Sequence, residues 1–246
     1  MRIGIMQPGY LPWLGYFEQM SRCDIFAHLD TVQYTQYDWR NRNRIKTKNG
    51  VEWLTVPVGT GHRMKIDEVL IKNEEPWSRK HLASIRANYG RTRFFNIYFG
   101  ELTEILNTEW PYLVDLDIEL IGWLSKKLGI NIKTVRTSQL PSTNEDKQFR
   151  IVEICKKLGC NQLYVGQKSQ SYIETDMFAV QGITVEFQEY KHPYYNQTWS
   201  KKQGFISYLS IIDLLFNHGP DSLAILKNEK IIAPVDCMQI RNANDL

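Results

Sequence analysis

The alternation of apolar and polar positions predicts short buried strands that alternate with amphipathic helices. Residues 2–6, RIGIM, form an apolar run that ends at a Gln-Pro-Gly turn, as is typical of a buried strand. Residues 13–23 favour a helix, and residues 24–30, DIFAHLD, favour a second strand. A strand, a helix and a strand within about thirty residues form a βαβ unit, which implies a parallel sheet.

The dipeptide Asn49-Gly50 lies between two alternating segments and predicts a two-residue hairpin turn. This turn would pair Lys46 with Trp53 and Ile45 with Leu54. Because side chains alternate across a strand, the basic residues at 40, 42, 44, 46 and 48 would share one face, which is commonly a solvated edge. Asn41 and Asn43 would lie on the other, apolar face, where their amides need partners in neighbouring loops or in a ligand.

The rest of the chain continues the alternation of helices and strands. Helices are predicted at 78–89, 95–107, 112–130, 147–159 and 205–219, and strands at 131–140, 161–166 and 182–190. In the helix at 112–130, leucines four residues apart form one stripe, and Gly129 stands where the helix should end. We therefore predict an α/β, Rossmann-like fold with a mostly parallel sheet, a β-hairpin insertion and a helical middle region. The 246 residues are treated as one domain, with a candidate sub-boundary near Pro141.

Composition and motifs exclude several classes of protein. The 30 Lys and Arg against 27 Asp and Glu leave a net charge of +3, which disfavours a dedicated nucleic-acid binder. Because the chain shows neither a signal-peptide pattern nor an apolar run of about 18 residues, we predict a cytoplasmic protein that does not enter the membrane. Its cysteines and histidines form no zinc pattern, so we predict no metal. The dinucleotide, P-loop and α/β-hydrolase fingerprints are also missing.

Candidate binding residues follow the predicted strands. In an open α/β sheet, ligands bind at the carboxyl ends of the strands, near the point where the strand order reverses. Aromatic rings and amides at that edge would provide stacking surface and oriented hydrogen bonds for a sugar or a base. The residues predicted there are Gln7, Tyr10, Trp13, Tyr16, Gln33, Tyr164 and Gln167. Of these, Trp13 and Tyr16 would also fit the core side of the first helix.

Charged residues beside this edge are the candidates for catalysis. Asp30 ends the second strand and is the predicted general base, although a carboxylate there could also cap the turn. Arg42 and Arg44 could hold a pyrophosphate by bidentate contacts, to which Arg150 in the first turn of a later helix would add. We predict Asp30 and Arg42 as catalytic residues, and Asn41, Asn43, Arg44 and Arg150 as binding residues.

Several segments resemble the WbqC-like protein family: MQPGYLPWLGYFEQM, DIFAHLDTVQY and WRNRNRIK in this order, and FISYLSIIDLLFNHG near the end. The resemblance runs from Met1 to about Gly219 and implies a role in bacterial O-antigen or other surface-polysaccharide biosynthesis. Its motif falls on Gln7, Pro8, Gly15, Tyr16, Asp24, Asp30, Gln33, Trp39, Asn41, Arg42, Asn43, Ser210, Asp213 and Asn217. It adds Asn217 to the predicted binding residues. The first strands are also similar to nucleotidylyltransferase folds, but PWLGY replaces their H-x-G-H, so this likeness implies architecture alone.

The leading hypothesis is an enzyme that modifies a nucleotide-linked amino sugar by N-acyl or aminoacyl transfer. Asp30 would deprotonate the sugar ammonium, and an acyl donor, an aminoacyl donor or ATP is the implied co-substrate. One alternative is an ATP-dependent amide ligase that acts on the same sugar. Another is a non-catalytic accessory protein that binds a sugar nucleotide or glycan. The expected partner is a small nucleotide sugar. We expect no binding to nucleic acid or to a membrane, and the sequence leaves the oligomeric state open.

Overall fold

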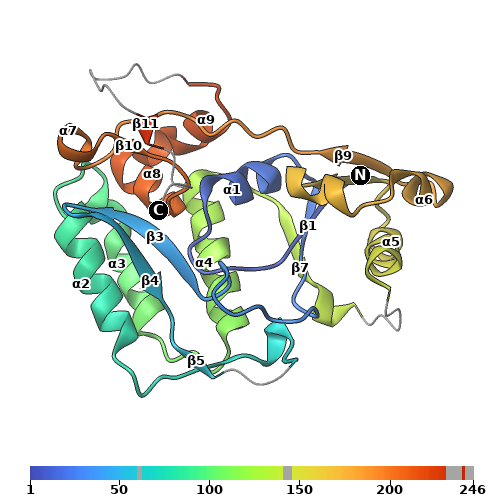
Figure 1. The fold of residues 1–246 in the computed structure, drawn as a ribbon, viewed down its shortest axis with the longest axis horizontal. Helices are drawn as coiled ribbons and strands as arrows, with labels where there is room; N and C mark the ends of the chain where they lie inside the picture. The colour runs from blue at the N-terminus through green and yellow to red at the C-terminus, as the bar shows by residue number, and fades with distance from the viewer. Residues whose placement is uncertain (60–62, 141–145, 231–239, 242–246) are drawn as a thin grey trace.

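A parallel sheet forms the centre of the protein in a computed structural model, which describes residues 1–59, 63–140, 146–230 and 240–241. The strand order is β7-β2-β1-β8-β9 (Figure 1). These strands are β1 (Arg2–Met6), β2 (Ile25–His28), β7 (Lys133–Arg136), β8 (Gln162–Val165) and β9 (Thr184–Phe187). Numbered along the chain, the order is 3-2-1-4-5, as in doubly wound nucleotide-binding folds. The predicted α/β class with a mostly parallel sheet is confirmed; the sub-boundary near Pro141 falls outside the described residues.

Helices cover both faces of this sheet. On one face, α5 (Lys147–Lys157) and α6 (Thr175–Val180) pack in an apolar cluster with Ile3 and Ile5 of β1 (Figure 1). On the other face, α1 (Leu14–Ser21) and α4 (Leu113–Leu128) belong to a larger apolar cluster. As predicted, α4 ends at Gly129, which is left-handed with a φ of 79°.

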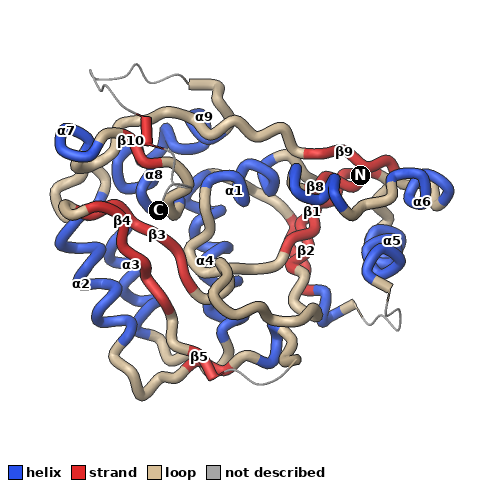
Figure 2. Tube along the Cα trace, in the orientation of Figure 1, coloured by secondary structure: helices blue, strands red, loops and turns tan. Residues whose placement is uncertain are grey.

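The hairpin and the helical middle region lie between β2 and β7 in the chain, as predicted. They comprise β3 (Arg42–Thr47), β4 (Gly50–Thr55), β5 (Val58–Gly59), β6 (Leu70–Ile71), α2 (Trp77–Tyr89), α3 (Phe95–Asn107) and α4. Figure 2 shows β3, β4, α2 and α3 on the far side of α4 from the sheet. After β9 come α7 (Ser200–Gln203), β10 (Phe205–Ile206), α8 (Ile211–His218), α9 (Ser222–Leu226) and β11 (Ile240–Arg241). The helix predicted from residue 205 therefore begins six residues later, where Ser210 caps its first turn.

The register of the hairpin differs from the prediction by two residues. Thr47 pairs with Gly50, so the turn residues are Lys48 and Asn49, and Trp53 lies opposite Arg44 rather than Lys46. The Thr47 hydroxyl donates to the Gly50 carbonyl (3.1 Å) and accepts from the Asn49 amide (3.2 Å), which closes the turn one position early. Because the shift is even, the side chains of β3 stay on their predicted faces, whereas Arg40 precedes the strand.

The basic face of the hairpin is not uniformly solvated, because Lys46 is fully buried. Its Nζ donates to Gln197 Oε1 (3.0 Å) and to the Gly204 carbonyl (2.5 Å). Nearby, the Tyr89 hydroxyl donates to Asp213 Oδ1 (2.8 Å). Burial raises the pKa of Asp213 to about 6, although hydrogen bonds and the charge of Lys46 oppose the shift. Lys46 thus serves the core rather than a solvated edge.

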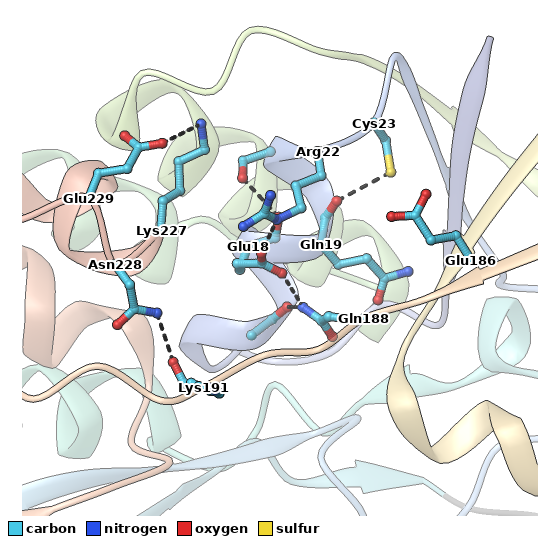
Figure 3. Close-up of polar contacts among 12 residues, drawn as sticks. Glu18, Gln19, Arg22, Cys23, Glu186, Gln188, Lys191, Lys227, Asn228 and Glu229 are labelled. Atoms are coloured by element: carbon cyan, nitrogen blue, oxygen red, sulfur yellow. Dashed lines mark hydrogen bonds and ion pairs between the residues drawn. The ribbon is translucent and has the colours of Figure 1, made fainter.

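Polar contacts anchor α1 to the sheet and to the strand-end segments (Figure 3). Gln19 Nε2 donates to the Tyr164 carbonyl in β8 (2.9 Å), and Gln188 Nε2, just after β9, donates to the Gly15 carbonyl (2.9 Å). The buried Glu18 carboxylate accepts from both Arg22 and Gln188. These contacts hold the helix that carries Tyr16.

Candidate functional site

Five polar side chains meet inside the protein next to the carboxyl ends of β1 and β2. This buried polar cluster consists of Tyr10, Tyr16, His28, Arg40 and Asp117. It is formed by the loop after β1, the helix α1, the end of β2, the segment before β3, and α4. The reversal of strand order lies between β1 and β8, so the cluster stands beside the edge where doubly wound folds bind ligands.

Asp117 is the least satisfied member of the cluster. It is 0% exposed, and neither of its carboxylate oxygens has a hydrogen-bond partner among the described residues. Burial raises its pKa well above the ordinary value, and the charge of Arg40 only partly offsets this. A buried carboxyl group without partners costs about 1–3 kcal/mol or more. This cost is unexplained by the fold and indicates a group that binds a ligand.

Arg40 is the cationic member of the cluster and reaches its outer side. Its side chain is 18% exposed, and Nη2 lies 3.3 Å from Asp38 Oδ2. Nη1 donates to the Pro8 carbonyl (3.4 Å), while Nε is buried without a partner within the described part of the chain. Burial lowers the pKa of Arg40, and the nearby Asp38 and Asp117 carboxyls raise it. One guanidinium group thus lies between solvent and the buried carboxyl.

Two tyrosine–histidine pairs line the cluster with neutral groups. The Tyr16 hydroxyl is 3.2 Å from His28 Nδ1, and the Tyr10 hydroxyl is 2.9 Å from Nδ1 of His81 in α2. Burial lowers the pKa of both histidines to about 4, so both are neutral at pH 7. Burial and the charge of Asp117 raise the pKa of both tyrosines. Aromatic faces and neutral donors therefore surround the carboxyl group.

The loop after β1 is held in a constrained conformation. Leu11 is fully buried with a φ of +44°, a backbone conformation that costs an ordinary residue about 1–3 kcal/mol. Asn43 Nδ2 donates to the carbonyls of Tyr10 (3.3 Å) and Leu11 (2.7 Å). At Gly9, a Cβ atom would come within 2.6 Å of the Trp39 carbonyl, so only glycine permits this approach. The predicted ligand residue Asn43 thus positions this loop.

A cleft of about 410 Å³ opens between β4 and the start of α2. Its lining includes Trp53, Trp77, Lys80 and His81. Because His81 also bonds to Tyr10, the inner wall of the cleft is joined to the buried polar cluster by one hydrogen bond. The volume is in the range of pockets that hold small molecules.

Exposed aromatic rings and arginines alternate on the outer face of the hairpin. We call Tyr37, Trp39, Arg42, Arg44 and Trp53 the arginine–aromatic ladder. The guanidinium carbon of Arg42 is 4.3 Å from the centre of the Trp53 ring, and that of Arg44 is 5.1 Å from the centre of the Trp39 ring. The two indole rings are 5.2 Å apart. The predicted phosphate ligands Arg42 and Arg44 are therefore brought together, with their planes available for stacking.

Asp30 is enclosed by hydrogen bonds and is 0% exposed. Oδ1 accepts from the Thr137 hydroxyl (2.9 Å) and the Ser138 amide (2.8 Å), and Oδ2 accepts from Arg136 Nε (2.9 Å) and the Ser138 hydroxyl (2.7 Å). Burial alone would raise the pKa of Asp30, but these hydrogen bonds outweigh it and lower the pKa. Such a carboxylate is a poor proton acceptor, so the general-base role is not carried into the proposal below.

Replacing Asp30 with asparagine should lower the free energy of unfolding by about 2–3 kcal/mol at pH 7, because Arg136 and Ser138 lose a charged acceptor. The folded-state pKa is lowered, so this contribution is present at neutral pH and is lost as the pH falls through the folded-state value. Urea unfolding at pH 7 measures the change. Asp115→Asn is the matched control, since Asp115 also pairs with Arg136 but is 36% exposed, and should cost less than about 1 kcal/mol. Equal losses in the two variants would contradict the role of Asp30.

The other predicted residues are distributed around the molecule. Gln7 is half-buried directly after β1, whereas Gln33 and Gln167 are exposed. Trp13 packs against Tyr190 and Tyr208, and Asn41 donates to the Val56 carbonyl (2.8 Å). Three predicted binding residues lie away from the cluster. Arg150 is in the first turn of α5, on the opposite face of the sheet, the Tyr164 ring lies against Arg2, and Asn217 donates to a carbonyl within α8.

Comparison with known proteins identifies the family. The model of the WbqC-like protein family matches residues 7–225. The chain belongs to the WbqC-like protein family. It is also 32% identical over 225 residues to the uncharacterized protein Rv1507c of Mycobacterium tuberculosis, an alignment that spans 90% of this chain and 95% of the relative. No solved structure matches the chain, so the likeness to nucleotidylyltransferase folds stays a prediction.

Across the ranges that the structure describes, none of the helices has the length and apolar character needed to cross a membrane. Within the same ranges, histidine, cysteine and acidic side chains do not form a group of three that could hold a metal ion.

Sequence reasoning missed three members of the site of this WbqC-like protein: His28, Arg40 and Asp117. Asp117 carried a readable signal. It lies four residues after Leu113 and three before Leu120, so it falls on the apolar side of the predicted helix, where a carboxyl group is unexpected. Arg40 was assigned to a basic strip, because the bend that turns it inward while Arg42 stays outside is not a local property.

Proposed function

We propose that this protein acylates the amine of a nucleotide-linked amino sugar, within the surface-polysaccharide biosynthesis that the family resemblance implies. The observation that carries the proposal is the buried, unpartnered Asp117 beside Arg40. A carboxyl group in an aromatic, water-poor cluster suits a substrate amine, and an adjacent guanidinium suits the negative charge of a linked phosphate.

The raised pKa of Asp117 gives the amine its reactive form. Most sugar amines enter as ammonium groups, which are not nucleophilic. A carboxylate whose pKa is raised by burial is a stronger base than an exposed one, so it can accept a proton from the ammonium and leave the nitrogen a free electron pair. Asp117 thus takes the general-base role that the sequence suggested for Asp30.

The transfer then needs an activated acyl or aminoacyl group, such as a thioester. The amine nitrogen attacks the carbonyl carbon, the C–N bond forms, and the bond from that carbon to the leaving group breaks. The second proton of the amine goes to the departing group, so atoms and charges balance. We assign the acyl donor to the cleft that His81 lines, because His81 is hydrogen-bonded to Tyr10 of the buried polar cluster.

Incubation with UDP-, dTDP- or GDP-linked amino sugars and acyl-coenzyme A, followed by mass spectrometry, tests the proposal. We expect one sugar nucleotide to gain the mass of one acyl group without consumption of ATP. Product formation only with ATP, magnesium and a free acid would favour an amide ligase instead. A ligand at 100 times its Kd stabilises a protein by about 2.7 kcal/mol, so a thermal shift without any product would favour a non-catalytic binding protein.

A further inference from the structure

The arginine–aromatic ladder lies outside the buried polar cluster, and it borders the cleft assigned to the acyl donor, because Trp53 also lines that cleft. Its rings stay accessible: Trp53 is 41% exposed, Trp39 38% and Tyr37 81%. Arg42 and Arg44 both lie against the Trp53 ring, at 4.3 and 5.5 Å from its centre. The ladder therefore joins two positive charges to exposed stacking surface on one face of the hairpin.

The chemistry of this face selects an anion attached to a planar ring. A guanidinium group stacked on an indole can direct N–H groups to phosphate oxygens. Its orientation is already restricted before binding, because Arg42 Nη2 donates to the Tyr37 carbonyl (2.5 Å) and Arg44 Nη2 to the Tyr208 carbonyl (3.2 Å). Arg42 Nε is buried and has no partner within the described residues, so one donor of the ladder is unused. Exposed tryptophan faces stack with nucleobases.

We propose that the arginine–aromatic ladder binds a nucleoside diphosphate, with the base on the tryptophan rings and the phosphates on Arg42 and Arg44. This inference rests on the proposed function, since it places the nucleotide half of that substrate. It also assigns the two halves to different surfaces: the nucleotide outside on the hairpin, and the amino sugar inside.

Continuity between the two surfaces supports this arrangement. Trp39 of the ladder directly precedes Arg40 of the cluster, and the Trp39 carbonyl packs on Gly9 in the loop after β1. The Tyr10 amide donates to the Arg40 carbonyl (3.0 Å), so the loop after β1 is bound to the segment that connects the two surfaces. Arg40 lies between them with its side chain partly exposed, where it would meet the phosphate next to the sugar.

Titration calorimetry with UDP, dTDP and GDP, without any sugar or acyl donor, tests the ladder. One of the three should bind the wild-type protein and quench its tryptophan fluorescence. Trp53→Ala and Trp39→Ala should each weaken binding by about 10-fold or more. Arg42→Lys keeps the charge but not the planar group, and should weaken binding by about 5-fold. The control is Tyr112→Ala, which removes a ring that is 42% exposed at the start of α4 and should bind as the wild type does.

The possible results distinguish a failure of the nucleotide-binding proposal from a failure of the proposed acyl transfer. Unchanged nucleotide affinity in all three ladder variants would overturn the ladder while leaving acyl transfer intact. Tryptophan-dependent nucleotide binding in a protein without transferase activity would support the ladder and reject the proposed function. The nucleotide assignment is wrong if none of the three nucleotides binds at a concentration of about 1 mM, while a short RNA or anionic lipid vesicles bind through the same tryptophans.

Discussion

Replacing Asp117 with asparagine is expected to lower the rate of amine acylation by about 10²–10⁴-fold, the usual contribution of a general base. The amide has nearly the same shape, but it cannot accept the proton from the substrate ammonium. The folded protein should not lose stability, because the substitution removes a buried carboxyl group that lacks partners within the described residues. Steady-state kinetics with the sugar nucleotide identified above, together with thermal unfolding, measures both effects.

The matched control for Asp117 lies on the same helix. Glu119 is an exposed residue of α4, two positions later, and Glu119→Gln should leave both rate and stability unchanged. A structural role for Asp117 predicts the opposite pattern, with lower stability and normal turnover per folded molecule. Retention of full activity in Asp117→Asn would remove Asp117 from the chemistry.

Replacing Lys46 with methionine is expected to lower the free energy of unfolding by about 2–5 kcal/mol at pH 8. The change leaves the Gly204 carbonyl and Gln197 Oε1 without the buried ammonium, and takes a cation away from Asp213. Urea unfolding gives the difference. Lys48 is an exposed residue of the hairpin turn, two positions after Lys46, and Lys48→Met should change stability by less than about 0.5 kcal/mol.

The loss in the free energy of unfolding caused by Lys46→Met should also depend on pH. Burial raises the pKa of Asp213 to about 6, so the folded protein holds that proton at pH 5 and releases it as the pH rises past 6. Below pH 6 the neutral Asp213 needs no neighbouring cation, whereas at pH 8 the ionised form does. The destabilisation by Lys46→Met should therefore be smaller at pH 5 than at pH 8. An equal loss at both values would mean that Lys46 does not stabilise ionised Asp213.

Some residues of the candidate site could be predicted from local sequence patterns. Of the aromatic residues predicted at the edge of the sheet, Tyr10 and Tyr16 lie in the buried polar cluster. Arg42 and Arg44 were correctly grouped, because side chains two apart on a strand share a face. Asp30 was found as a notable strand-end carboxylate, but its partners Thr137 and Ser138 follow a strand that lies more than a hundred residues later. Contacts at that separation leave no local pattern.

The sequence by itself determined most of the strands and helices of the central α/β unit, because the spacing of apolar residues is a local property that each element must satisfy before it can pack. It also determined the faces of the hairpin, since these depend only on the strand period of two. The register depended on the Thr47 hydroxyl, a local contact that the Asn-Gly rule does not include. Tertiary structure decided the burial of Lys46, whose partners Gln197 and Gly204 come from far along the chain. It also decided that Asp117 of α4 would meet Arg40 from before β3, because distant segments come together only when the whole apolar core has packed.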